Sequence, residues 1–76
     1  MTQYASLEAL LAHRQALARG PRTPVLDQID ETIRSILGEA SRLVVEEPAD
    51  SAARRHRDRA ESKLRRELIA RGVITG

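Results

Sequence analysis

The sequence contains no cysteine, no phenylalanine and no tryptophan, and Tyr4 is its single aromatic residue. Without cysteine, the chain cannot form a disulfide, bind zinc through thiolates or use a thiol nucleophile. A core without large rings must be built from Leu, Ile, Val and Ala. Because a chain of 76 residues can bury only one small core, we expect a helical protein that completes its core by self-association or by binding a partner.

Long apolar runs and the pattern of a signal peptide are also absent. No run of about 18 apolar residues exists, so we expect no membrane-spanning helix and no membrane partner. The first residues lack the basic and apolar regions of a secretion signal. We therefore expect the cytoplasm as the compartment.

The residues that usually carry chemistry are scattered. His13 and His56 lie in different predicted helices, and neither has a second histidine one turn away, so a metal site is not expected. The glycines form no phosphate-binding loop and the serines have no nucleophile elbow. A group of carboxylates near residue 30 lies in the first turns of a predicted helix, where the helix dipole favours acids. We expect no enzymatic activity, no cofactor and no small-molecule substrate.

Three segments are predicted to be helical, and the first spans residues 3–19. Thr2 or Ser6 can act as its N-cap, and Gly20 followed by Pro21 ends it, since glycine accepts the left-handed conformation and proline cannot continue the helix.

The second predicted helix, 24–47, carries the clearest pattern. Thr23 is a suitable N-cap and Pro24 suits the first helical position. Gly38 inside the helix indicates a close neighbour or a bend. Apolar residues follow one another at alternating spacings of three and four, which is the pattern of a buried or self-associating seam: Leu26, Ile29, Ile33, Ile36, Ala40 and Leu43.

Residues 26–31, with Ile33, Ile36 and Leu37, resemble the opening helix of the helical chorismate mutases. That family binds a dicarboxylate through arginines that flank this pattern and through a following lysine. At the corresponding places this sequence has Asp27 or Gln28, and then Ala40 or Ser41. The resemblance therefore transfers no catalytic residue to this chain.

The third predicted helix, 51–71, starts from Asp50 or Ser51 and ends at Gly72, which would place Val73 against Leu68 in a Schellman cap. Its apolar line is thin, so we predict that its N-terminal half stands free of the core. The line consists of Ala53, Ala60, Leu64 and Leu68, with His56 on the same face.

These segments predict a single all-α domain in which residues 1–48 form a helical hairpin and residues 49–76 form an arginine-rich C-terminal helix. The alternatives are a three-helix bundle, or a dimer in which two hairpins make an antiparallel four-helix assembly. In the second case the apolar seam would be the dimer interface.

Charge divides along the same boundary. Residues 1–48 carry five arginines against seven acids, whereas residues 49–76 carry seven arginines and Lys63 against four acids. Arginine forms bidentate contacts with carboxylate and phosphate. The residues expected to contact a partner are Arg54, Arg55, Arg57, Arg59, Arg65 and Arg66.

Two functions agree with this pattern. The first is a small non-enzymatic interaction protein, an adaptor, regulator or assembly factor that forms a homodimer or docks on another protein. The alternative is a nucleic-acid-binding protein that uses the arginine-rich helix. Interleaved acids and the lack of aromatic residues for base stacking argue against the alternative.

Overall fold

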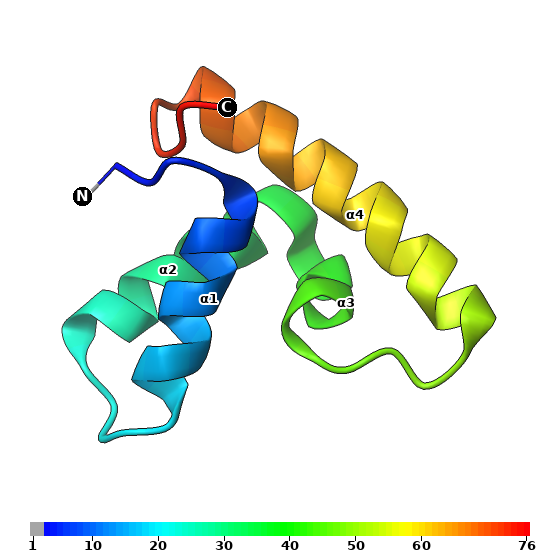
Figure 1. Cartoon of the computed structure of the whole chain (residues 1–76), viewed down its shortest axis with the longest axis horizontal. Coiled ribbons are helices and arrows are strands. Elements are labelled where there is room, and N and C mark those ends of the chain that lie inside the picture. Colours follow the sequence, from blue (N-terminus) through cyan, green and yellow to red (C-terminus); the bar gives the residue numbers. More distant parts are fainter. Residues whose placement is uncertain (1–2) are drawn as a thin grey trace.

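The computed structural model describes residues 3–76 and confirms the all-α class. Its elements, shown in Figure 1, are α1 (Leu7–Ala18), α2 (Pro24–Leu37), the 3₁₀ turn η1 (Gly38–Ser41), the one-turn α3 (Arg42–Val45) and α4 (Ser51–Ala70). In the described residues, extended pairing is limited to an isolated bridge between Tyr4 and Ile74. The long helices α1, α2 and α4 pack on one another around one core.

Helix α2 begins as the sequence predicts and ends ten residues early. The Leu26 N–H donates to Thr23 Oγ1 over 3.3 Å, and Pro24 occupies the first turn. Gly38 then adopts φ 60° and ψ −133°, a conformation that side-chain-bearing residues rarely reach. The predicted continuous helix over 24–47 is therefore wrong beyond Leu37. The chain turns at Gly38 and resumes as η1 and α3.

The core is aliphatic and draws on every long helix. The first four members of the predicted seam are buried in it, whereas Ala40 and Leu43, which follow the break, are half-buried. The complete buried set is Leu7, Leu10, Leu26, Ile29, Ile33, Ile36, Val44, Ala60, Leu64, Leu68 and Ile74.

Helix α4 contributes more to this core than its thin apolar line predicted. Leu64 and Leu68 have no exposed surface, and Ala60 is also buried. Ala53 is half-buried, and His56, expected on the same face, is exposed. The C-terminal half of α4 therefore packs on the rest of the chain as the third helix of a bundle.

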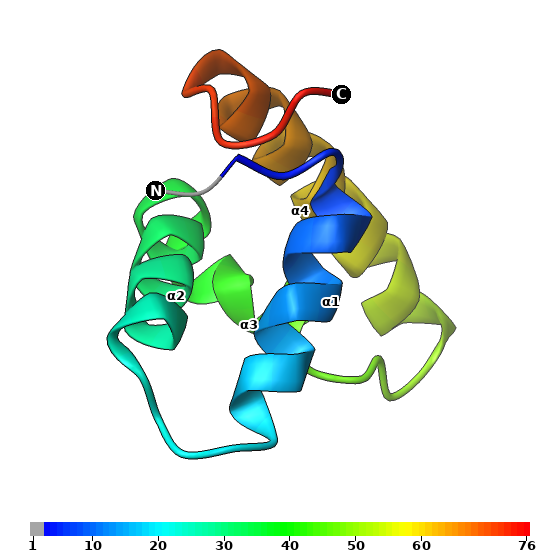
Figure 2. The same cartoon turned by 60° about the vertical axis from the view of Figure 1, so that its left-hand side comes forward.

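The segment before α1, from residue 3 on, and the C-terminal segment meet beside α4. Ser6 Oγ accepts from the Ala9 N–H over 3.1 Å, so Ser6 is the N-cap and α1 starts at Leu7 instead of residue 3. Thr2, the other predicted cap, lies outside the described residues. Tyr4 pairs with the C-terminal segment: its N–H donates to the Val73 carbonyl over 2.8 Å, and its carbonyl accepts from the Thr75 N–H over 3.0 Å. Figure 2 shows the two terminal segments side by side.

The predicted cap at Gly72 is present. Gly72 has φ 75°, its N–H donates to the Ile69 carbonyl, and the Val73 N–H donates to the Leu68 carbonyl over 2.9 Å. These two hydrogen bonds define a Schellman motif. The turn redirects the chain so that Ile74, only 1% exposed, enters the core.

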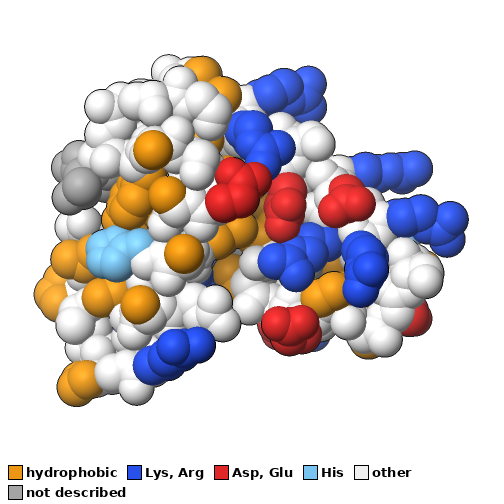
Figure 3. Space-filling view, viewed as in Figure 1, with side chains coloured by type: hydrophobic (Ala, Val, Ile, Leu, Met, Phe, Trp, Pro, Cys, Tyr) orange, Lys and Arg blue, Asp and Glu red, His pale blue; other side chains and the backbone are white. Residues whose placement is uncertain are grey.

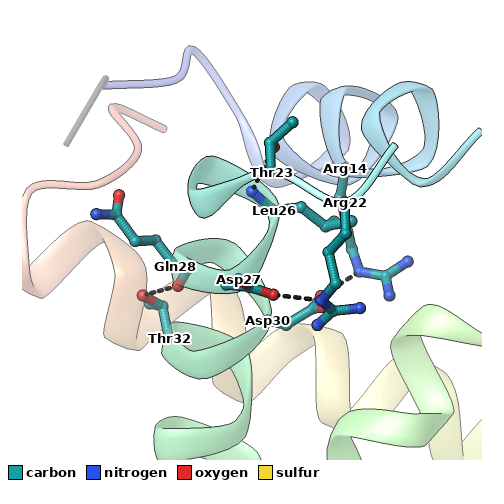
Figure 4. A network of polar contacts seen from close by, with 8 residues as sticks. All are labelled: Arg14, Arg22, Thr23, Leu26, Asp27, Gln28, Asp30 and Thr32. Atoms are coloured by element: carbon teal, nitrogen blue, oxygen red, sulfur yellow. Dashed lines mark hydrogen bonds and ion pairs between the residues drawn. The ribbon is translucent and has the colours of Figure 1, made fainter. Parts of the chain in front are cut away.

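Arginines join α1 and the following turn to α2. Arg14 Nε donates to Asp30 Oδ1, and Arg22 pairs with Asp27 and Asp30 (Figure 4). The side chains of Arg14 and Asp30 are both largely buried, at 21% and 16% exposure. Asp30 therefore links α2 to α1, and Asp27 links α2 to the turn that precedes it.

Candidate interaction surface on α4

The outer face of α4 carries a row of four cations, Arg55, Arg59, Lys63 and Arg66, which we call the basic row. Their spacings of four, four and three residues place them on one side of the helix, each about one turn from the next. This side lies opposite the buried Ala60, Leu64 and Leu68. All four side chains are exposed, and Figure 3 shows cationic groups projecting from the α4 edge of the molecule.

The basic row is free of internal charge pairing. Within residues 3–76, none of its four cations lies within ion-pair distance of an acid. Asp58 and Glu67 border the row on its two sides, and no acid interrupts it. Exposed cations with no partner keep their full capacity to bind an anionic surface.

Two other arginines of α4 have structural roles instead. Arg57 Nε donates to Glu61 Oε1 over 2.9 Å, and both side chains are mostly buried, at 30% and 23% exposure. Arg65 donates to Glu8 of α1. Hydrogen bonding to its own backbone N–H lowers the pKa of Glu8, and the charge of Arg65 lowers it further. This pair ties α4 to α1 across the surface.

The structure thus divides the six arginines named from the sequence. Arg55, Arg59 and Arg66 belong to the basic row, whereas Arg57 and Arg65 are engaged within the chain. Arg54 is exposed but projects about 100° away from Arg55 around the helix.

Sequence reasoning missed two members of this surface, Lys63 and Ile69. Lys63 completes the row, and its spacing from Arg59 and Arg66 was the signal that could have found it. Ile69 lies three residues after Arg66 and is 45% exposed, which makes it one of the two large exposed hydrophobic side chains of the described chain. The basic row therefore ends on an apolar contact point.

The predicted self-association seam has another role in this structure. Leu26, Ile29 and Ile33 are at most 4% exposed in the single chain. Their burial is complete without a second copy, so a dimer built on them would first have to open the core.

The histidines lie apart. Tyr4 Oη and His13 Nδ1 are hydrogen-bonded at 2.8 Å, and His56 is exposed on α4. No three His, Cys, Asp or Glu side chains in the described part of the chain are grouped so as to hold a metal ion. Among those same residues, no helix combines the length and apolar character needed to cross a membrane.

Comparison with known proteins adds no relative: no family model, curated protein or solved structure matches this chain.

Proposed function

We propose that the chain is a non-enzymatic interaction protein, an adaptor or regulator, that binds an acidic protein surface through the basic row of α4. The observation that supports this most is the combination of four unpaired cations with the exposed Ile69 at the end of the row. The proposed interface is therefore both cationic and partly apolar.

The arginines suit carboxylate partners. A planar guanidinium can form two parallel hydrogen bonds to one carboxylate. Successive cations of the row are separated by about 4.5–6 Å along the helix axis. A partner helix with acids at the same spacings can meet each cation in turn.

Three features favour a protein partner over nucleic acid. Ile69 offers apolar contact that a phosphate backbone does not use. Asp58 and Glu67 repel any anion beside the row, which disfavours a phosphate backbone with a charge at every nucleotide more than a protein whose acids lie only opposite the row. Finally, the one Phe, Tyr or Trp residue, Tyr4, is in the terminal pairing and contacts His13, so the imidazole of His56 is the only ring that α4 offers for base stacking.

Fluorescence anisotropy tests the proposal with four labelled probes: an acidic helical peptide with glutamates at the spacing of the row and one leucine beyond it, duplex DNA, single-stranded DNA and RNA. We expect the acidic peptide to bind most tightly. Its affinity should fall between about 0.02 M and 0.15 M salt, because exposed charge pairs are screened. Tighter binding of any nucleic acid at the higher salt would replace the proposal with the nucleic-acid alternative.

Two matched variants locate the interface. Arg55→Gln/Arg59→Gln/Arg66→Gln removes three charges from the row, and we expect it to lose peptide binding while its helical circular dichroism is unchanged. Arg19→Gln/Arg34→Gln/Arg42→Gln removes three exposed arginines elsewhere and should bind nearly as well as the original chain. Equal loss in both variants would mean that only net charge matters, and would refute a defined surface on α4.

A further inference from the structure

A groove of about 390 Å³ lies between α1 on one side and α3 and α4 on the other. Apolar side chains line it, including Leu11, Val44 and Val45, and Leu11 and Val45 remain partly exposed. Figure 3 shows apolar surface in this hollow with charged groups around it. The groove has room for one or two side chains of another molecule.

The rim of this groove is acidic. Its lining contains four glutamates and two arginines. Arg57 is paired with Glu61 and Arg14 with Asp30, so both arginines are already neutralised. Glu47 has no ion-pair partner within residues 3–76, and Glu46 meets only Arg42, at 3.7 Å between two exposed side chains. Two carboxylates are thus free to receive cations.

Glu46 and Glu47 also border a second hollow, of about 430 Å³, on their other side. That hollow has a mainly apolar wall, which includes Leu43, Pro48 and Ala53. The two carboxylates therefore stand between two hollows that both have apolar side chains in their lining. A segment with several cations and an aliphatic side chain would match these two carboxylates and the apolar side chains beside them.

The chain itself presents such a segment in the basic row and Ile69. We propose that the basic row of one copy binds the acidic groove of a second copy. The inference rests on the proposed function in that both use the basic row as a binding surface. The occupant of the groove is α4 of another copy, because its charges are opposite to those of Glu46 and Glu47 and its Ile69 can contact the apolar side chains of the groove.

The basic row can reach this groove only in a second copy, because the row and the groove lie on different sides of α4. The groove is lined by Arg57 and Glu61, on the flank of α4 that turns toward α1 and α3. The basic row occupies the opposite, solvent-facing side of the same helix. A rigid helix cannot present both sides to one groove. Self-association would therefore occupy the row and compete with an acidic partner for it.

Sedimentation equilibrium of the full chain tests the inference with three variants. The groove variant is Glu46→Arg/Glu47→Arg, and the row variant is Arg55→Glu/Arg59→Glu/Arg66→Glu. The control, Gln28→Arg/Glu31→Arg, adds positive charge to exposed positions of α2 away from the groove. Circular dichroism and thermal melts establish that each variant is folded.

At low salt we expect the average mass of the original chain and of the control to rise above 8.5 kDa as concentration increases, and to return to it at high salt. The groove variant and the row variant should each self-associate at least about tenfold more weakly than the original chain. An equimolar mixture of the groove and row variants should regain association as a one-to-one pair, since the mixture contains one intact row and one intact groove.

Three results would overturn the inference: an original chain that stays at the monomer mass at every concentration, a row variant that still associates, or a mixture that does not pair. The acidic peptide separates this failure from failure of the proposed function. The groove variant keeps an intact row, so it should bind the peptide whether or not copies associate.

Discussion

The two halves of α4 have the same helical backbone and different surroundings. In residues 60–70, Leu64 and Leu68 are completely buried and Ala60 is nearly so. In residues 51–59 no side chain is buried. That half is held by its Asp50 cap, by the Arg57–Glu61 pair and by packing against α3. The buried side chains of the C-terminal half therefore supply stability, whereas the exposed cations of the basic row, in both halves, can change with little effect on the fold.

The largest expected effect comes from emptying the buried half. Leu64→Ala should lower the free energy of unfolding by about 2–5 kcal/mol, because Leu64 has no exposed surface and its truncation leaves a cavity in the core. Ile69→Ala, on the exposed side of the same half, should cost less than about 0.5 kcal/mol. Urea denaturation followed by circular dichroism measures both. Similar costs for the two variants would contradict the division of α4 into a buried and an exposed face.

A smaller effect is expected at Gly38, which positions the α3 turn under the N-terminal half of α4. Gly38→Ala should cost about 1–3 kcal/mol, because its φ of 60° strains any residue with a Cβ. The cost is purely conformational, since an added Cβ would meet no atom within 4 Å. Gly20→Ala, at a glycine without positive φ, should leave thermal stability unchanged or slightly raised. A neutral Gly38→Ala would show that the backbone can relax there.

Removing the cap of α4 should act on its exposed half alone. The Ala53 N–H donates to Asp50 Oδ1 over 2.8 Å, and Asp50→Ala should cost about 1 kcal/mol. Amide hydrogen exchange should accelerate in the first turns of α4, while the amides around Leu64 stay protected. Asp50→Asn keeps an acceptor oxygen and should restore most of the protection. Uniform acceleration along α4 would mean that the helix unfolds as one unit.

The smallest effect concerns the Glu8–Arg65 link, which joins the buried half of α4 to α1. The pKa of Glu8 lies below its ordinary value of 4.5 in the folded chain. Its contribution to stability is therefore present above about pH 4.5 and is lost as the pH falls through the lowered folded pKa. The difference in melting temperature between the original chain and Glu8→Gln should shrink on acidification. A difference that does not change with pH would show that the Glu8 charge contributes nothing.

Local chemistry was read correctly from the sequence at four caps, whereas Gly20 does not adopt the left-handed conformation expected of it. Ser6, Thr23, Asp50 and Gly72 act as caps because a cap depends on one side chain or one φ angle within a single turn. The cations of the basic row were likewise visible, apart from Lys63. Their spacing on a helix is fixed by the 3.6-residue period.

The interruption of the second predicted helix was harder to read. The apolar spacing continues through Ala40 and Leu43, as it would in an unbroken helix. A glycine such as Gly38 inside a helix lowers helix stability only mildly. The sequence indicated a bend at Gly38 only as one of two alternatives, and the turn there allows Val44, 4% exposed, to be buried in the core. That gain comes from contacts between elements, which no local pattern contains.

The sequence by itself determined the helical class, the caps and the side of α4 on which its cations lie, because these follow from composition and helical period. Only the tertiary structure decided which arginines are paired between helices, whereas the Arg57–Glu61 pair is an i,i+4 contact within α4. Arg65 is engaged by Glu8, which lies 57 residues earlier, and the basic row is left without acids. It also decided that the first four members of the apolar seam are buried in a single chain, since α1 and α4 pack against α2. Both outcomes depend on distances between residues far apart in the sequence, which are fixed only when the helices pack.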